Sequence, residues 1–156
     1  MRKRSLSMFA VLLFLFFIQN GFSQSNDILD RLLDEEQATL GNAAYLVFLA
    51  AGVASEEWSI DRSIEELRSR DIGFEGAEVN TPVDFGSLSF LIMQTFDIKG
   101  GIMYSLFPGR RYAARELAYL GFIPGFASPS RILTGAEVTH VIGRTLDYLG
   151  EREVLQ

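Results

Sequence analysis

Three stretches of the chain place apolar residues at the spacing i, i+3, i+4, i+7, which is the period of a helix with one buried face. The apolar positions are Ala43, Leu46, Val47 and Ala50, then Leu88, Leu91 and Ile92, and last Val138, Val141 and Ile142, with Thr95 and Thr145 completing the second and third stripes. A residue suited to a helix N-cap precedes each stretch: Thr39, Asp84 and Thr134. A glycine suited to a left-handed C-cap follows each one: Gly52, Gly100 and Gly150. The pattern predicts three capped helices.

A second helical pattern lies ahead of each stretch. The predicted partner helices are Asp27–Glu36, Ile60–Arg70 and Tyr112–Leu120. Ser63 with Glu66 and Thr134 with Glu137 have the spacing of a capping box, in which two side chains satisfy two free N–H groups at a helix start. Loops rich in Gly and Pro, at 73–82 and 121–130, join the second and third pairs. Each pair therefore reads as a helix–loop–helix unit.

The three units also align with one another. A shift of 50 residues superposes 60–100 on 110–150 without a gap, and a shift of 45 superposes 39–51 on 84–96. Such internal periodicity is typical of repeat architectures. The sequence predicts an all-α fold in which three helix–loop–helix repeats, about 27–53, 60–100 and 110–150, share one core within a single domain, 24–156.

The N-terminus has the layout of a secretory signal peptide. Three basic residues, Arg2, Lys3 and Arg4, precede an apolar run from Met8 to Ile18, and Gly21 and Ser23 supply small residues for cleavage. We expect residues 1–23 to be removed and the protein to be exported, to the periplasm or cell envelope. No later stretch reaches the ~18 apolar residues of a membrane span. An uncleaved N-terminal anchor is the alternative.

Composition narrows the chemistry. The chain contains no cysteine, which excludes disulfides, thiol catalysis and cysteine metal ligands. Without residues 1–23 it carries 11 basic and 20 acidic side chains, a net charge of −9, so bulk attraction to nucleic acid is not expected. Residues 24–97 hold 15 of the acids with 4 arginines, whereas 98–156 hold 5 acids and 7 bases. This asymmetry indicates either two differently solvated faces or a binding surface.

His140, the single histidine, aligns with Tyr45 and Phe90 on the helix face opposite the apolar stripe. We interpret it as a ring that packs, with a polar recognition patch formed by Glu137, His140 and Arg144 as the alternative. No motif for nucleophilic or metal-dependent catalysis accompanies it, and one histidine without companion ligands does not predict a metal site. We expect no enzyme activity, no cofactor and no metal.

The sequence "ARELAYLGFIPGFASPSRILTGAEVTHVIGRTL" (114–146) resembles a surface-layer homology (SLH) repeat. The matching residues are Leu120, Gly121, Ile123, Gly125, Phe126, Pro129, Leu133, Thr134, Ala136, Glu137 and Arg144. The arginine of the family's signature is replaced in every copy, by Leu40, Phe85 and Gly135. The resemblance implies an exported helical module that anchors proteins to cell-wall-linked glycans through grooves between repeats.

Other arginines could contact such a ligand. The link 104–115 places aromatic rings beside guanidinium groups, which suit sugar rings and acidic substituents. The candidate ligand-binding residues are Tyr104, Arg110, Arg111, Tyr112 and Arg115 of the link, with Arg131, Thr134, Glu137 and Arg144 of the third copy. The predicted function is a non-catalytic envelope module that binds cell-wall-linked glycan. The alternative is an envelope protein-interaction subunit, docking through its acidic half or through apolar faces opposite the core stripe.

Overall fold

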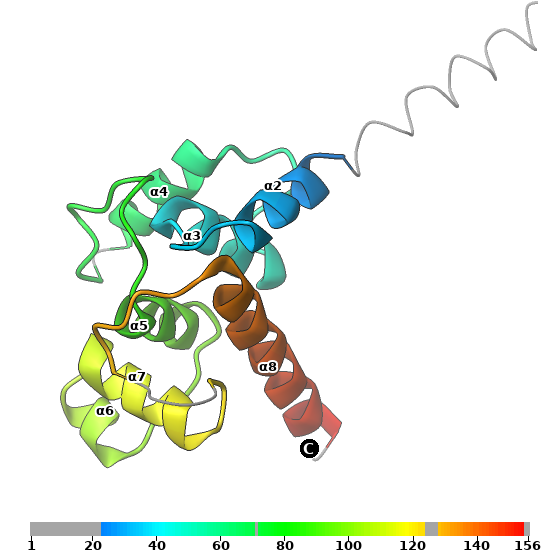
Figure 1. Cartoon of the computed structure of the whole chain (residues 1–156). Helices are drawn as coiled ribbons and strands as arrows, with labels where there is room; N and C mark the ends of the chain where they lie inside the picture. Colours follow the sequence, from blue (N-terminus) through cyan, green and yellow to red (C-terminus); the bar gives the residue numbers. More distant parts are fainter. Residues whose placement is uncertain (1–22, 71, 124–127, 155–156) are drawn as a thin grey trace, which may run out of the picture.

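The computed structural model describes residues 23–70, 72–123 and 128–154, and these residues form helices without a strand (Figure 1). The helices are α2 (Ser23–Leu33), α3 (Leu40–Ala50), α4 (Ile60–Ser69), α5 (Phe85–Thr95), α6 (Ile102–Leu106), α7 (Arg110–Tyr119) and α8 (Gly135–Val154). The all-α prediction is confirmed. Apart from Ser23, the predicted signal peptide lies outside the described residues. None of the helices within them combines the length and apolarity needed to cross a bilayer.

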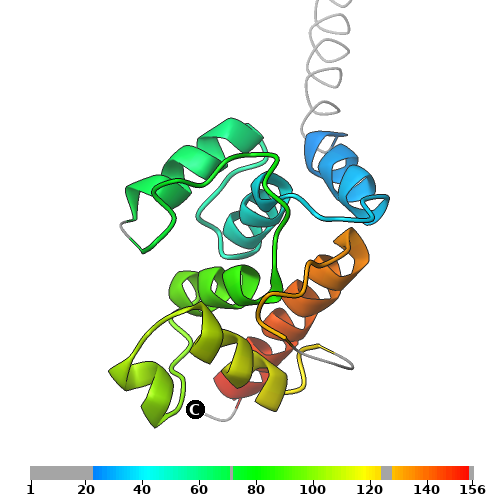
Figure 2. The same ribbon diagram turned by 60° about the vertical axis from the view of Figure 1, so that its left-hand side comes forward.

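Helices α3, α5 and α8 contact one another at the centre of the molecule. Helix α4 packs on α3, α7 packs on α5, and α2 packs on both α8 and α3 (Figures 1 and 2). The predicted stripes supply much of the core: Ala43 and Val47, Leu88, Leu91 and Ile92, and Val138, Val141, Ile142 and Thr145 are buried. The first helix therefore covers the last one, although they lie at opposite ends of the described chain.

Backbone hydrogen bonds link the segments that enter the three inner helices into a closed ring. The amide of Ala38 donates to the carbonyl of Leu133 at 2.8 Å, and that of Leu133 donates to Val83 at 3.0 Å. The amide of Val83 donates to Ala38 at 2.8 Å. All three side chains are buried, so each of these polar groups needs a partner within the protein. The ring fixes the starts of α3, α5 and α8 relative to one another.

The first residue of each inner helix is held in a similar way. The amides of Leu40, Phe85 and Gly135 donate to the carbonyls of Thr81, Arg131 and Glu35 at 2.7, 2.9 and 3.0 Å. Amides in the first turn of a helix have no partner inside that helix, so the neighbouring segment satisfies them. The approach is closest at Gly135, where an added Cβ would lie 1.5 Å from the carbonyl oxygen of Leu32. Only glycine fits there.

The caps of α5 and α8 agree with the predictions. Asp84 accepts a hydrogen bond from the amide of Ser87 at 2.6 Å. At α8 the capping box is complete, because the amide of Glu137 donates to the Thr134 hydroxyl at 3.3 Å and the Glu137 carboxylate accepts from the Thr134 amide at 3.0 Å.

Helix α3 begins after Thr39 as predicted, but the Thr39 side chain caps no amide. A carboxylate from outside the helix accepts hydrogen bonds at the start of α3 instead. Glu35 accepts from the Thr39 amide at 2.8 Å and from the Asn42 side chain at 2.5 Å. Glu35 is free to do so because α2 ends at Leu33, three residues earlier than predicted.

The capping box predicted at Ser63 and Glu66 is wrong. Helix α4 starts at Ile60, as the predicted range does, and its cap is Ser59, four residues before Ser63: the Ser59 hydroxyl accepts from the Arg62 amide at 3.2 Å. Ser63 is buried inside the helix, and its hydroxyl donates to the Ser59 carbonyl at 3.3 Å.

Two of the three predicted C-cap glycines are also wrong. Gly52 has the expected left-handed conformation, with φ +69°. Helix α5 instead ends before Asp97, which takes φ +49°, so Gly100 is not its cap. Gly150 lies inside α8, which continues to Val154. Gly73 and Gly121, with φ +80° and +73°, follow α4 and α7 and take the left-handed conformation there.

The interpretation of His140 as a packing ring is wrong. Tyr45 and Phe90, its counterparts in the alignment, are buried, whereas His140 is exposed. The difference arises because α4 and α7 cover the outer sides of α3 and α5, while that side of α8 faces solvent. Helix α6 was not predicted either, since its residues read as part of the link between the second and third units.

Candidate ligand-binding site

Arg110 and Arg111 are neighbours in sequence but reach different pockets. They occupy the first two positions of α7, and successive helical residues point about 100° apart. Arg110 turns toward the loop that follows α4, and Arg111 turns toward α6. The predicted cluster of guanidinium groups is therefore divided between two sites.

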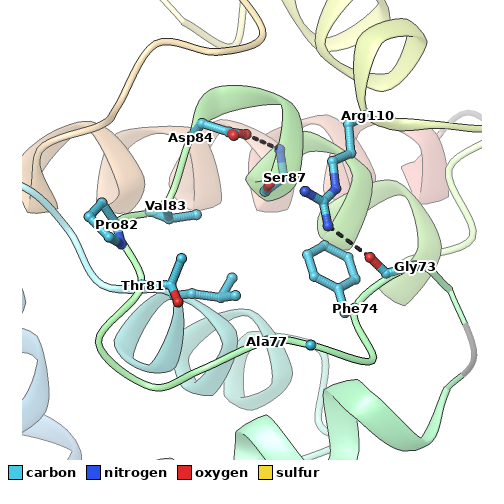
Figure 3. Close-up of a pocket in the computed structure, with 11 residues that line it drawn as sticks. Gly73, Phe74, Ala77, Thr81, Pro82, Val83, Asp84, Ser87 and Arg110 are labelled. Atoms are coloured by element: carbon cyan, nitrogen blue, oxygen red, sulfur yellow. Dashed lines mark hydrogen bonds between the residues drawn. The ribbon is translucent and has the colours of Figure 1, made fainter.

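The first site is a pocket of about 330 Å³, which we call the Phe74 pocket. Its lining comes from the loop after α4, from the starts of α3 and α5, and from α7. The lining residues are Leu40, Gly73, Phe74, Gly76, Ala77, Thr81, Pro82, Val83, Asp84, Ser87 and Arg110 (Figure 3). The pocket lies beside the backbone ring, because Val83 belongs to both.

Arg110 is held in this pocket by two contacts. Its guanidinium carbon lies 4.7 Å from the centre of the Phe74 ring, and Nη2 donates to the Gly73 carbonyl at 2.8 Å. Phe74 is itself fixed, because it is buried and stacks on Phe90 with ring centres 6.2 Å apart. Figure 3 shows a second guanidinium nitrogen directed toward the side of the pocket where Ser87 lies. A guanidinium positioned before binding loses less conformational entropy when it takes up a ligand.

Polar groups complete the wall opposite Phe74. Asp84 and Ser87 lie at the start of α5, joined by the cap hydrogen bond, and Thr81 adds a hydroxyl. A ligand in the pocket would therefore meet one cation, one carboxylate and two hydroxyl groups. Hydroxyl-rich molecules such as sugars match this mixture of donors and acceptors.

The second site is a pocket of about 330 Å³ that contains three predicted residues, Arg111, Tyr112 and Arg115. Its remaining walls are Met103, Ala118 and Pro129. We call it the Arg111 pocket. Both arginines are exposed and Tyr112 is half-buried, so the guanidinium groups are open to solvent.

Tyr104 does not join either pocket. Its ring is buried against the edge of Phe90, with centres 6.5 Å apart, and its hydroxyl accepts a hydrogen bond from Gln94 at 2.8 Å. Burial raises the pKa of the Tyr104 hydroxyl, and the Gln94 hydrogen bond opposes this only in part. Its position is that of a core residue which attaches α6 to α5.

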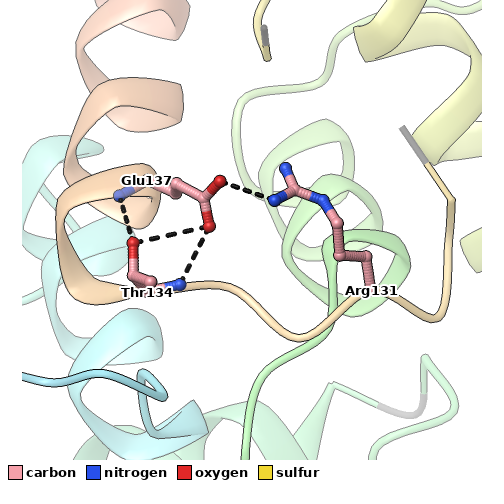
Figure 4. A network of polar contacts seen from close by, with 3 residues as sticks. All are labelled: Arg131, Thr134 and Glu137. Atoms are coloured by element: carbon pink, nitrogen blue, oxygen red, sulfur yellow. Dashed lines mark hydrogen bonds and ion pairs between the residues drawn. The ribbon is translucent and has the colours of Figure 1, made fainter. Parts of the chain in front are cut away.

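Arg131, Thr134 and Glu137 form one polar network at the start of α8 (Figure 4). Arg131 Nη1 lies 2.6 Å from Glu137 Oε1, while the other carboxylate oxygen takes part in the cap. Burial acts to raise the pKa of Glu137. The hydrogen bonds from Thr134 and Arg131, with the Arg131 charge, outweigh it and lower the pKa below the ordinary 4.5. The network holds the helix start, but it leaves Nε and Nη2 of Arg131 buried without a hydrogen-bond partner among the described residues.

Arg144 lies separately on the exposed side of α8, 3.6 Å from Asp147. The described residues contain no group of three or more His, Cys, Asp or Glu side chains that could hold a metal ion.

Phe74, Thr81 and Ser87 line the pocket but were not predicted from the sequence, and Asp84 was predicted only as a helix cap. An aromatic residue in the glycine-rich loop 73–82 was the available signal. Comparison of the chain with family models, with curated proteins and with solved structures finds no match.

Proposed function

We propose that this chain is an exported, non-catalytic module of the cell envelope that binds an acidic, cell-wall-linked glycan. In this proposal residues 1–23 are removed, and the remaining domain is three degenerate SLH-like repeats. The resemblance of 114–146 to that family supports it. So do the ring positions Ala38, Val83 and Leu133, which are separated by 45 and 50 residues, the same shifts that align the sequence with itself.

The observation that carries the binding proposal is Arg110 in the Phe74 pocket. Its guanidinium is fixed by Phe74 and the Gly73 carbonyl, and its remaining N–H groups can donate to a carboxylate of an acidic sugar. The Asp84 carboxylate and the Ser87 and Thr81 hydroxyls are placed to bond sugar hydroxyls. The Arg111 pocket would hold a further acidic residue of the same polymer. Both pockets contain a residue from the first turns of α7, so a single glycan polymer could reach both pockets.

Retention on purified cell-wall sacculi tests this function. Arg110→Ala with Arg111→Ala should abolish retention, and added salt should weaken the parent's binding, because contact rests on local positive charge. Arg62→Ala with Arg152→Ala is the matched control. Like Arg110, both of these arginines are exposed and lie over an aromatic ring, but they lie outside both pockets, so this variant should leave retention intact.

Further variants separate the parts of the proposal. Arg110→Lys keeps the charge but loses the planar fork, so it should weaken binding as well. Incubation with sacculi should release no new reducing ends. Mass spectrometry of the exported protein should find an N-terminus near Gln24. If the two double variants behave alike, or the parent is not retained, glycan binding is wrong.

The alternative function is an envelope protein-interaction subunit without glycan binding. One form of it is removed by the structure: the apolar faces opposite the stripes of α3 and α5, including Phe48 and Met93, are buried inside the protein and cannot dock a partner. The acidic half remains a possible docking surface. Failure of sacculus retention together with capture of a basic envelope protein would favour this alternative.

A further inference from the structure

Helix α6 and the residue after it leave four large apolar side chains in solvent. Ile102 is 78% exposed, Leu106 63%, Phe107 62% and Met103 45%. We call this set the α6 tip. Single exposed apolar residues are ordinary on protein surfaces. Four within six consecutive residues form an apolar patch, and such patches mark interaction sites.

Contacts with α5 hold the helix that carries the α6 tip in place. Tyr104, on the opposite side of the helix, is buried and bonded to Gln94 of α5. The chain enters α6 through Gly100, where an added Cβ would lie 2.8 Å from the Tyr104 side chain. Both views place α6 at the outer edge of the molecule, beside α7 (Figures 1 and 2). The apolar residues are therefore presented outward by a fixed helix.

Positive charge lies beside the tip, although the Glu116 carboxylate also lies close to the start of α6, against Gly101. Residues 98–115 contain four basic side chains and no acidic one, in a chain whose residues 24–97 carry a net charge of −11. Lys99, Arg111 and Arg115 are exposed, and the last two share a pocket with Met103 of the tip. Cations thus lie directly beside the apolar side chains.

We propose that the α6 tip docks on the surface of an anionic lipid bilayer. The apolar side chains enter the boundary between headgroups and acyl chains, and Lys99, Arg111 and Arg115 meet the lipid phosphates. A short element with bulky apolar residues and flanking cations has the composition of interfacial membrane contacts. A protein partner fits less well, because a stable protein interface needs about 20 residues from each side and the tip offers four protruding ones.

Fluorescence of a reporter on the tip tests the proposal in the full chain, because such a reporter responds to contact of the tip itself with lipid. The chain has one tryptophan, Trp58, which stacks with Arg62 just before α4. With Trp58→Phe as background, Phe107→Trp places the reporter on the tip, and Leu106→Trp is an independent second reporter. Leu146→Trp is the matched control, since Leu146 is a similarly exposed residue of α8, outside the tip.

Vesicles of phosphatidylglycerol and phosphatidylethanolamine should shift the emission of both tip reporters to the blue, and brominated acyl chains should quench them. The Leu146→Trp reporter should not change, and phosphatidylcholine vesicles or high salt should abolish the effect. Ile102→Ser with Leu106→Ser should reduce partitioning of the Phe107→Trp reporter by more than about tenfold, because each buried CH₂ contributes substantially to insertion.

The Ile102→Ser with Leu106→Ser variant should remain bound to sacculi, since neither residue lines the Phe74 pocket or the Arg111 pocket, so the two proposals can fail separately. Three results would overturn membrane docking: no response at the tip, an equal response at Leu146→Trp, or a blue shift caused by soluble envelope protein without lipid.

Discussion

Replacing Gly135 by alanine should destabilise the fold by about 3 kcal/mol, which is large against the ~5–15 kcal/mol of a typical domain. The added Cβ would lie 1.5 Å from the carbonyl oxygen of Leu32 and 2.4 Å from its carbonyl carbon. These are backbone atoms, so no side-chain rotation can relieve the contact. Helix α2 and the start of α8 must move apart, although Leu32 is fully buried between them.

The magnitude follows from three effects. Strain from overpacking costs about 1–3 kcal/mol, and loss of the 3.0 Å hydrogen bond from the Gly135 amide to Glu35 costs about 1 kcal/mol. Partial exposure of Leu32 adds a fraction of the ~1.5–3 kcal/mol for burying such a side chain. The higher helix propensity of alanine offsets up to about 1 kcal/mol of this destabilisation.

Urea denaturation followed by far-ultraviolet circular dichroism measures the difference. Gly143→Ala is the matched control, because Gly143 lies in the exposed middle of the same helix with nothing within 4 Å of an added Cβ. That variant should be stabilised by up to about 1 kcal/mol. If the free energy of unfolding of Gly135→Ala lies within about 0.5 kcal/mol of the parent's, the close packing of α2 against α8 is wrong.

Three further variants test the start and the exposed side of α8. Thr134→Ala should cost about 1 kcal/mol in the same urea assay, since it removes the acceptor of the Glu137 amide; an unchanged midpoint would contradict the cap. Glu137 has a folded-state pKa below its ordinary 4.5, so its contribution is present above pH 4.5 and is lost as the pH falls through the folded value. Glu137→Gln should therefore be less stable than the parent at neutral pH and equal to it in strong acid, and a constant difference would refute this. His140→Phe should shift the midpoint little, because His140 is exposed; a loss of several kcal/mol would reveal an essential contact.

Helical periodicity and capping residues predicted most of the fold. Asp84 and Thr134 were identified correctly because an N-cap bond is local and joins residues three positions apart. Ser63 was misread because Ser59, one turn earlier, competes for the same function, and the sequence alone does not rank them. The C-cap prediction at Gly150 was wrong because a glycine ends a helix only where the backbone leaves the helical conformation, and α8 continues through Gly150 to Val154.

The candidate site was less predictable because its parts meet through tertiary contacts. Arg111, Tyr112 and Arg115 do share a pocket, as helical spacing allows. The partner of Arg110 is Phe74, 36 residues earlier in the chain, and no local pattern links them. Tyr104 looked like an exposed aromatic residue because α6 was not recognised, so its buried bond to Gln94 could not be foreseen.

The closed backbone ring constrains the order of folding during synthesis. Ala38 and Leu133 are 95 residues apart, so their bond forms only after the chain through Leu133 has left the ribosome. Until α8 arrives, α2 lacks the helix that completes the burial of Leu32. Contacts at such separation must first overcome the entropy of closing a long loop, which slows folding. Helix α2, which precedes the other described helices in the chain, is thus among the last of them to be held in place.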